Sequence, residues 1–131
     1  VALDSAKVWS TLDPDSVQAQ QILAELYITS GNLSKAKPIV KKLLEQDAYR
    51  GEGFLYLNSI LAKVENKKNA LRFVLNIAEP YPNSKEAHFA VAHAAYFANN
   101  KKLTNSELAK IKKIDPKWQT AVLFEGYIIS L

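Results

Sequence analysis

A period of 34 residues constrains this chain more than any other feature of its sequence. Pro14, Ala48, Pro82 and Pro116 follow one another at that interval, and three of the four are proline. An apolar series keeps the same spacing between them, at Leu23, Leu57 and Val91. A fixed period in this range is typical of one supersecondary unit stacked on copies of itself. The sequence therefore predicts a scaffold, which supplies a surface rather than a reaction.

The segments between these positions have the residue pattern of paired helices. In the first of them, Ile22, Leu23, Leu26 and Tyr27 recur at helical spacing. Similar stripes predict further helices, and no segment alternates apolar and polar residues between hairpin turns, so the fold is expected to be all-α. The expected helices cover residues 17–30, 34–46, 51–64, 67–79, a stretch between Asn83 and Asn99, a shorter stretch from Thr104 to Ile114, and 117–131.

Short polar residues mark where several of these helices should begin. Three pairs resemble the reciprocal arrangement that caps helix N-termini: Asp15 with Gln18, Asn83 with Glu86, and Thr104 with Glu107. The third pair would start its helix late. Gly31 is expected just after the end of the 17–30 helix, where a left-handed backbone is common.

The composition suits one domain that folds without disulfide bonds. The chain has 131 residues, 48% of them apolar, which is enough for one continuous core. It has no cysteine, which excludes disulfides and thiolate metal sites. Its apolar runs are far shorter than the roughly 20 residues of a membrane span. Because the chain begins Val1-Ala2-Leu3 and contains no methionine, we expect it to be a piece of a longer polypeptide, and its cellular location stays open.

Placed in a 34-residue frame, the sequence resembles the tetratricopeptide repeat, a helix-turn-helix unit with small and large apolar residues at set positions. The match is carried in the first repeat by Leu23, Ala24, Tyr27, Gly31, Ala36 and Leu43, in the second by Phe54, Leu57, Leu61, Ala70, Ile77 and Pro82, and in the third by Val91, Ala92, Ala95 and Pro116. The related pentatricopeptide repeat, which reads RNA, fits the small residues and prolines less well.

The resemblance implies an α-solenoid of antiparallel helix-turn-helix pairs, wound into a right-handed superhelix. It divides the chain into a partial repeat at 1–16, full repeats at 17–50, 51–84 and 85–118, and a partial repeat at 119–131. Four residues depart from the family pattern. Asn58 and Thr104 stand at positions that are usually small, Ala48 at a proline position and Glu125 at an apolar position.

In the resembled family, the first helix of each repeat lines a concave groove that holds a partner segment. Carried over to this chain, the groove positions give nine candidates: Gln21, Glu25, Leu55, Ser59, Phe89, His93, Tyr96, Phe97 and Tyr127. The series becomes more aromatic toward the C-terminus. Phe89 and Phe97 could instead pack beneath the next helix, whereas the hydroxyls of Tyr96 and Tyr127 favour an exposed, polar position.

Some family members clamp a C-terminal carboxylate with Lys, Asn and Arg in this groove. The corresponding positions here hold Gln21, Glu25, Glu86 and Ala90, which do not match that clamp. The partner predicted by the resemblance is therefore another kind of protein or peptide segment.

No catalytic, metal or cofactor site stands out in the sequence. His88 and His93 are the only histidines, and five residues apart on a helix they point in different directions, which does not suit one metal ion. No pair of carboxylates suggests general acid and base catalysis, and the four glycines form no phosphate-binding loop. We therefore expect no enzymatic activity and no cofactor.

The formal charge is +4, and lysines cluster in turns and in the second helix of each repeat. We interpret them as a solvated outer face. The function that the sequence favours is a non-catalytic scaffold that binds a protein or peptide in its groove. Two alternatives stay open: a nucleic-acid surface built on the lysines, although nucleic acid is not the expected partner, and a structural or regulatory segment of a larger enzyme or membrane-anchored assembly. Ile128, Ile129 and Leu131 lack a covering helix, which predicts self-association through the last helix.

Overall fold

Residues 2–130, which the computed structural model describes, form eight helices and no strand. The expected all-α fold is confirmed, and the prediction for Leu131 lies outside the described residues. The helices are α1 (Ala2–Leu12), α2 (Val17–Thr29), α3 (Leu33–Leu44), α4 (Asp47–Leu61), α5 (Lys67–Ala78), α6 (Lys85–Phe97), α7 (Lys101–Ile114) and α8 (Gln119–Ser130).

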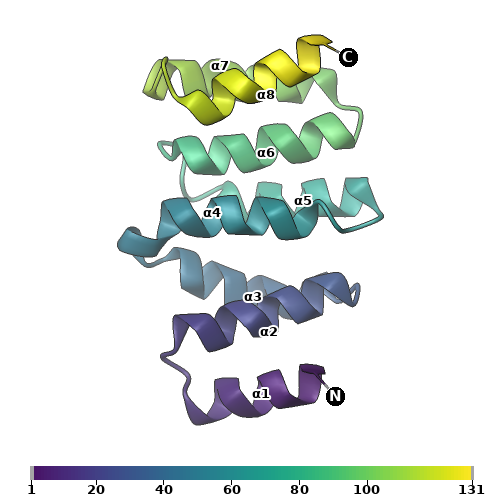
Figure 1. The fold of residues 1–131 in the computed structure, drawn as a ribbon, viewed down its shortest axis with the longest axis vertical. Coiled ribbons are helices and arrows are strands. Elements are labelled where there is room, and N and C mark those ends of the chain that lie inside the picture. The colour runs from purple at the N-terminus through teal and green to yellow at the C-terminus, as the bar shows by residue number, and fades with distance from the viewer. Residues whose placement is uncertain (1, 131) are drawn as a thin grey trace.

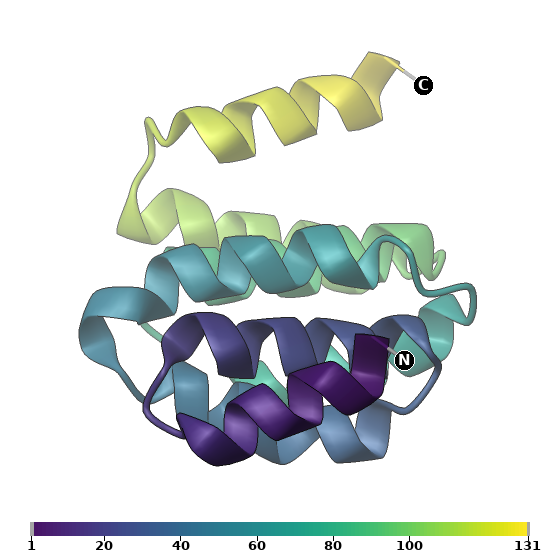
Figure 2. The same cartoon turned by 60° about the horizontal axis from the view of Figure 1, so that its bottom comes forward.

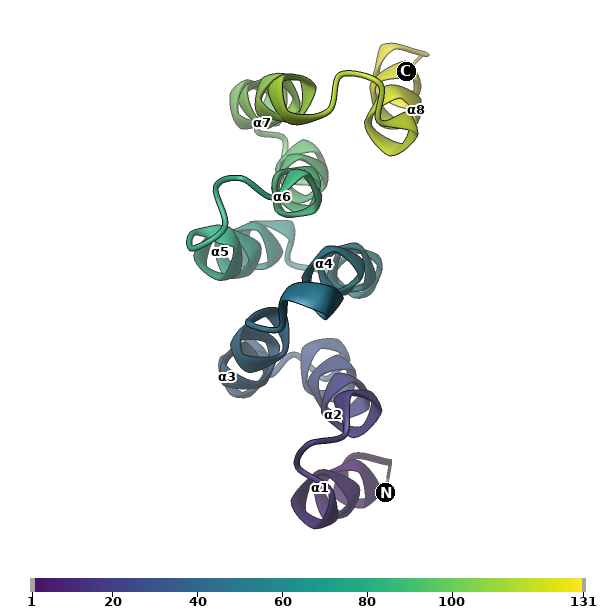
Figure 3. The same cartoon turned by 90° about the vertical axis from the view of Figure 1, so that its left-hand side faces the viewer.

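The helices stack into an elongated solenoid of two layers, with the chain ends at opposite ends of the stack (Figure 1). Seen from the side, α2, α4, α6 and α8 form one layer, which we call the first-helix layer, and α1, α3, α5 and α7 form the second-helix layer (Figure 3). In the first-helix layer, α6 is set back between α4 and α8 (Figure 3). This arrangement confirms the α-solenoid that the 34-residue period predicts.

Small residues at set positions bring the layers together. Ala24 on α2 and Ala36 on α3 are buried at their crossing, and Ala92 on α6 is buried with Thr104 on α7. Because these side chains are short, α2 packs closely on α3 and α6 packs closely on α7. A continuous apolar core follows the stack from Ala6 on α1 to Val91 on α6.

The second repeat differs from its neighbours in how its own two helices pack. α4 and α5 have few close backbone approaches, whereas α6 packs closely on both of them. The position held by Ala24 and Ala92 in the other repeats is held here by Asn58, which is half-buried. An amide side chain occupies the space that a close crossing would need, so α5 is displaced toward α6.

Two of the expected helix caps lie one residue from where the sequence placed them. The hydroxyl of Ser16, not the carboxylate of Asp15, accepts the backbone N–H of Ala19 at 3.1 Å. In the same way the hydroxyl of Ser84, not Asn83, accepts the N–H of Ala87. A serine directly before the first helical residue reaches the third N–H of the helix, which a residue one position earlier does not.

The late start predicted for the seventh helix is wrong. α7 begins at Lys101, where the side chain of Asn100 accepts the N–H of Leu103 at 3.1 Å. Thr104 lies inside the helix, and its hydroxyl donates to the carbonyl of Asn100 at 2.8 Å. Asn99 makes the preceding turn with a φ of 61°, which asparagine tolerates better than most residues. Gly31 likewise has a φ of 84° after α2, as the sequence predicted.

α4 begins at Asp47, four residues before the expected Gly51. The first helices of the other repeats begin after a proline, which disfavours a helical conformation in the residue before it. Before Gly51 that position holds Ala48 instead of proline, and Ala48 lies within the first turn of α4. The missing proline therefore lets this helix extend by about one turn.

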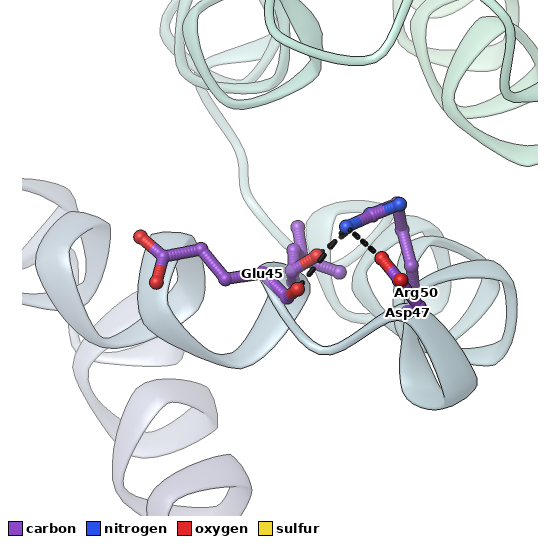
Figure 4. A network of polar contacts seen from close by, with 4 residues as sticks. Glu45, Asp47 and Arg50 are labelled. Carbon is purple, nitrogen blue, oxygen red and sulfur yellow. Dashed lines mark hydrogen bonds and ion pairs between the residues drawn. The ribbon is translucent and has the colours of Figure 1, made fainter.

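Arg50 holds that extra turn against the end of α3 (Figure 4). Its guanidinium donates to the carbonyls of Leu44 at 2.8 Å and Glu45 at 3.1 Å, and it pairs with Asp47 at 2.8 Å. It also lies 4.2 Å from the ring centroid of Tyr81. One side chain thus satisfies C-terminal carbonyls of α3 and stacks on the turn that precedes α6.

Candidate functional site

The aromatic candidates of the sequence meet between α6 and α8. Phe124 on α8 lies against three rings of α6: Phe89 at 5.5 Å, His93 at 5.3 Å and Tyr96 at 5.9 Å between centroids. Phe97 lies 4.8 Å from His93, and Tyr96 lies 6.3 Å from Tyr127. Most of these pairs are edge-to-face, a geometry that stabilises aromatic contacts. We call Phe89, His93, Tyr96, Phe97, Phe124 and Tyr127 the aromatic network.

The outer members of this network are exposed in spite of their ring contacts. Phe97 is 41% exposed and Tyr127 is 49% exposed. Leu55 on α4, the next helix of the same layer, is 36% exposed, and Ser59 one turn further along is exposed as well. Beside Phe97 lies a small cavity whose lining includes Asn58, Lys67 and His93. Exposed apolar side chains therefore occur on both helices that flank the recessed α6 and on α6 itself.

His93 lies inside the network and is half-buried. Burial, together with the positive charge of Lys67, lowers the pKa of His93 below its usual range. Around neutral pH its imidazole is therefore uncharged and packs as an aromatic ring. This position makes it a packing residue of the network rather than a candidate acid or base.

Phe89 is buried rather than available to a partner. It is 7% exposed and packs edge-to-face on Trp118 at 5.7 Å and on Phe124. Of the two roles that the sequence left open, packing beneath the next helix is the one that the structure gives Phe89. Phe97, eight residues further along α6, takes the other role, because it lies exposed near the end of that helix.

The two polar candidates on α2 are bound by tyrosines of α4. The hydroxyl of Tyr49 donates to Gln21 Oε1 at 2.6 Å, and the hydroxyl of Tyr56 donates to Glu25 Oε1. Burial, with repulsion from Tyr56 and Glu52, raises the pKa of Tyr49 to about 12. Burial and the bond to Glu25 raise the pKa of Tyr56 as well. Gln21 and Glu25 therefore join α2 to α4, and a ligand would compete with these bonds.

A buried polar cluster between α6 and α7 was missed by the sequence analysis. His88 Nε2 donates to the carbonyl of Pro82 at 2.6 Å, and Nδ1 lies 3.2 Å from Glu107 Oε2. Lys110 Nζ lies 3.0 Å from the same oxygen. The side chains of His88 and Glu107 are 11% and 7% exposed, so the cluster is a link between helices and not an open site. The 34-residue frame could have indicated this cluster, because it places Glu107 on the inward face of the second helix, where a carboxylate needs a buried partner.

α8 is held differently from the other helices. It has few close backbone approaches to any of them, and it contacts α6 through Phe124 and Ala121. Lys112 pairs with Glu125 at 2.9 Å, and Lys85 pairs with Asp115 at 2.7 Å while lying 5.0 Å from the Trp118 ring. The far side of α8 is exposed, with Val122 at 48% and Ile129 at 83%. Self-association through this helix stays a prediction, which sedimentation at rising protein concentration would check.

Neither a metal centre nor a membrane span emerges from the described residues. Among residues 2–130, no three His, Cys, Asp or Glu side chains are grouped so that they could hold a metal ion. Within the same range no helix is long and apolar enough to cross a membrane. The features that the fold does present are an exposed aromatic edge on the first-helix layer and a set of cations on the other.

These features define an α-solenoid of stacked helix pairs, and comparison with solved structures agrees with that fold class. The chain is similar to MamA, with 18% sequence identity, a TM-score of 0.55, and coverage of 95% of this chain and 76% of MamA. A MamA RS-1 ArsTM double mutant gives 15% identity, a TM-score of 0.54, and coverage of 91% and 67%.

A third similar structure is YrrB, described as a TPR protein with an unusual peptide-binding site. The identity is 16% and the TM-score 0.54, over 86% of this chain and 58% of YrrB, so the chain spans little more than half of that protein's length. No family model and no curated protein matches the sequence. At these identities the similarity establishes the fold, which is that of tetratricopeptide-repeat proteins.

Proposed function

We propose that this chain is a non-catalytic scaffold that binds a segment of another protein on its first-helix layer. The observation that carries the proposal is the exposed edge of the aromatic network, Phe97 and Tyr127, with Leu55 on the adjoining helix. Large apolar side chains kept at the surface by a rigid packing network are typical of recognition surfaces.

The interior of the network supports this assignment. His93 and Tyr96 pack on Phe97, and Tyr96 packs on Tyr127, so that the two exposed rings lose little conformational freedom when a partner covers them. Burying an apolar side chain contributes about 1.5–3 kcal/mol. Two or three such contacts, less the cost of association, give affinities in the micromolar range.

The repeat boundaries belong to the same proposal. We infer full repeats at 17–50, 51–84 and 85–118, with partial repeats at 1–16 and 119–131. The pairing of α2 with α3 and of α6 with α7 supports this division, because each pair lies within one proposed repeat. The described helices also agree with the chain being a structural segment of a larger assembly, in which the same surface would contact a neighbouring domain.

The proposal is tested with a peptide library selected against the full chain. The double variant Phe97→Ala/Tyr127→Ala should lose at least about tenfold in affinity for the selected peptides, because each truncation removes exposed apolar contact area. The matched control is Leu75→Ala/Ile114→Ala, since those residues are 40% and 42% exposed on the second-helix layer. Equal binding by the two double variants would reject the assignment of this surface.

A further inference from the structure

Charge is divided between the two layers of the solenoid. No carboxylate lies within α3, which carries Lys35, Lys37, Lys41 and Lys42, or within α5, which carries Lys67, Lys68 and Arg72. Of these cations, Lys67 lies at the start of α5, 6.0 Å from the Phe97 ring and beside the aromatic network. The formal charge of the whole chain is only +4. The cations are therefore concentrated on one side of the molecule rather than spread over it.

The rest of each layer continues this division. α7 carries five lysines and one carboxylate, Glu107, which is buried against His88, whereas α1 is balanced, with Lys7 and Asp4. The first-helix layer has the opposite balance, with two basic residues, Arg50 and Lys85, against five carboxylates: Glu25, Asp47, Glu52, Glu86 and Glu125. One layer thus carries excess positive charge and the other excess negative charge.

Most of the outer cations have no carboxylate near them. Among the described residues, only Lys110 and Lys112 of these three helices form ion pairs. Between α3 and α5 the surface has a shallow depression that contains two of the unpaired cations, Lys37 and Arg72. Its other polar lining is uncharged, from Ser34, Asn69 and Asn76. A depression lined by cations, amides and a hydroxyl, without a carboxylate, has the donors that bind phosphate oxygens.

We propose that the outer face of α3, α5 and α7, centred on the depression between α3 and α5, binds the phosphate backbone of a nucleic-acid duplex without sequence specificity. The charge of the face is complementary to a polyanion, and lysine, arginine, asparagine and serine are side chains that contact phosphates. This surface is separate from the aromatic network on the first-helix layer, and both partners could be bound at once.

The composition of the face favours a duplex over other polyanions. Binding of single strands uses aromatic side chains on which bases stack, and the one aromatic residue of these three helices, Phe73, is 5% exposed. Binding at a membrane interface uses apolar side chains that insert between lipids. On α3, α5 and α7, Leu75 and Ile114 are the two large apolar residues that are well exposed, one on α5 and one at the end of α7. A face of cations and amides with little else matches a backbone of phosphates.

The experiment measures binding of a fluorescent DNA duplex of mixed sequence to the full chain over a series of salt concentrations. The logarithm of the binding constant should fall linearly with the logarithm of the salt concentration. The double variant Lys37→Gln/Arg72→Gln should bind more weakly and reduce that slope by about two, one for each phosphate contact removed.

The matched control is Lys63→Gln/Lys117→Gln, which removes the same charge from two exposed turn lysines outside the outer helices. This control should leave the slope unchanged, and a single strand of the same length should bind more weakly than the duplex. Three results would overturn the proposal: no duplex binding at low salt, an equal loss of slope in both double variants, or binding to phosphatidylserine vesicles without binding to the duplex.

Discussion

The six helices from α2 to α7 and the last helix, α8, are stabilised in different ways. α2 to α6 share one apolar core, and α7 is joined to α6 by a close backbone approach, by Leu108 and Ile111, and by the buried pair of His88 with Glu107. α8 instead is attached by aromatic side chains and by the partly exposed pair of Lys112 with Glu125. Figure 2 shows it standing apart from the other ribbons. We infer that the stack unfolds as a unit, whereas α8 can detach from it alone.

The largest effect is expected from a truncation in the apolar core that runs from α1 to α6. Phe54 is 0% exposed and lies edge-to-face with Tyr81 at 5.8 Å. Phe54→Ala should reduce the free energy of unfolding by about 4 kcal/mol, since the surrounding helices can close only part of the resulting cavity. Urea denaturation followed by circular dichroism should show one transition at a lower midpoint. Two separate transitions would contradict a stack that unfolds as a unit.

A matched pair of carboxylate substitutions compares how α7 is joined to each of its neighbours. Glu107→Ala should cost about 3 kcal/mol, because His88 and Lys110 would lose the carboxylate that they face. Glu125→Ala removes the partner of Lys112, whose side chain is 59% exposed, and should cost less than about 1 kcal/mol. The measurement is again the urea midpoint. Similar costs for both variants would mean that the buried pair contributes no more than the exposed one.

Truncating the anchor of α8 tests whether that helix detaches alone. Phe124→Ala removes the ring that contacts Phe89, His93 and Tyr96. We expect a loss of about 2 kcal/mol in the local stability of α8, below the usual cost of a buried phenylalanine because a terminal helix can relax around the vacated space. Hydrogen exchange should become fast in α8 while protection in α2–α5 is kept. A uniform loss of protection along the chain would show that α8 does not detach on its own.

The smallest effect is expected in the pH dependence of stability, through His93, whose ring stacks on Phe124. Because burial lowers the pKa of His93 in the folded chain, the unfolded chain binds a proton at this residue more readily. The contribution of the neutral ring is therefore present above the ordinary pKa of about 6.5 and is lost as the pH falls below it. His93→Phe should lower the slope of stability against pH between about pH 7 and pH 5, as measured by urea denaturation. An unchanged slope would show that His93 stays accessible to solvent protons.

The fold was predictable from the sequence because its signals are local and repeated. The positions of Leu23, Leu57 and Val91 recur in register, and all three are buried on first helices. Helix starts were less predictable, since neighbouring polar residues compete as caps. Ser16 and Asp15 are both good N-cap residues, and the backbone conformation at Ser16 decides between them. The sequence shows that Ala48 replaces a proline, but the extra turn of α4 depends also on Arg50, which bonds to the end of α3.

The candidate site was predictable only as a set of positions. The sequence could place Phe89 and Phe97 on the same stripe of one helix, yet it could not say that Phe89 would be covered by Trp118 and Phe124 while Phe97 stayed exposed. The position of α8 decides this, and α8 departs from the repeat pattern at Glu125. In the same way, the bond between Tyr56 and Glu25 joins residues of two repeats and leaves no periodic trace in the sequence.

The sequence by itself determined the helices, their order and the small residues at which they cross, because each of these follows from side-chain spacing along one helix or from a pattern repeated every 34 residues. The tertiary structure decided which aromatic rings are exposed, that His88 meets Glu107, and that the lysine-rich helices α3, α5 and α7 lie in one layer (Figure 3). These features depend on distances between side chains of different helices, which are set by how closely the helix pairs pack.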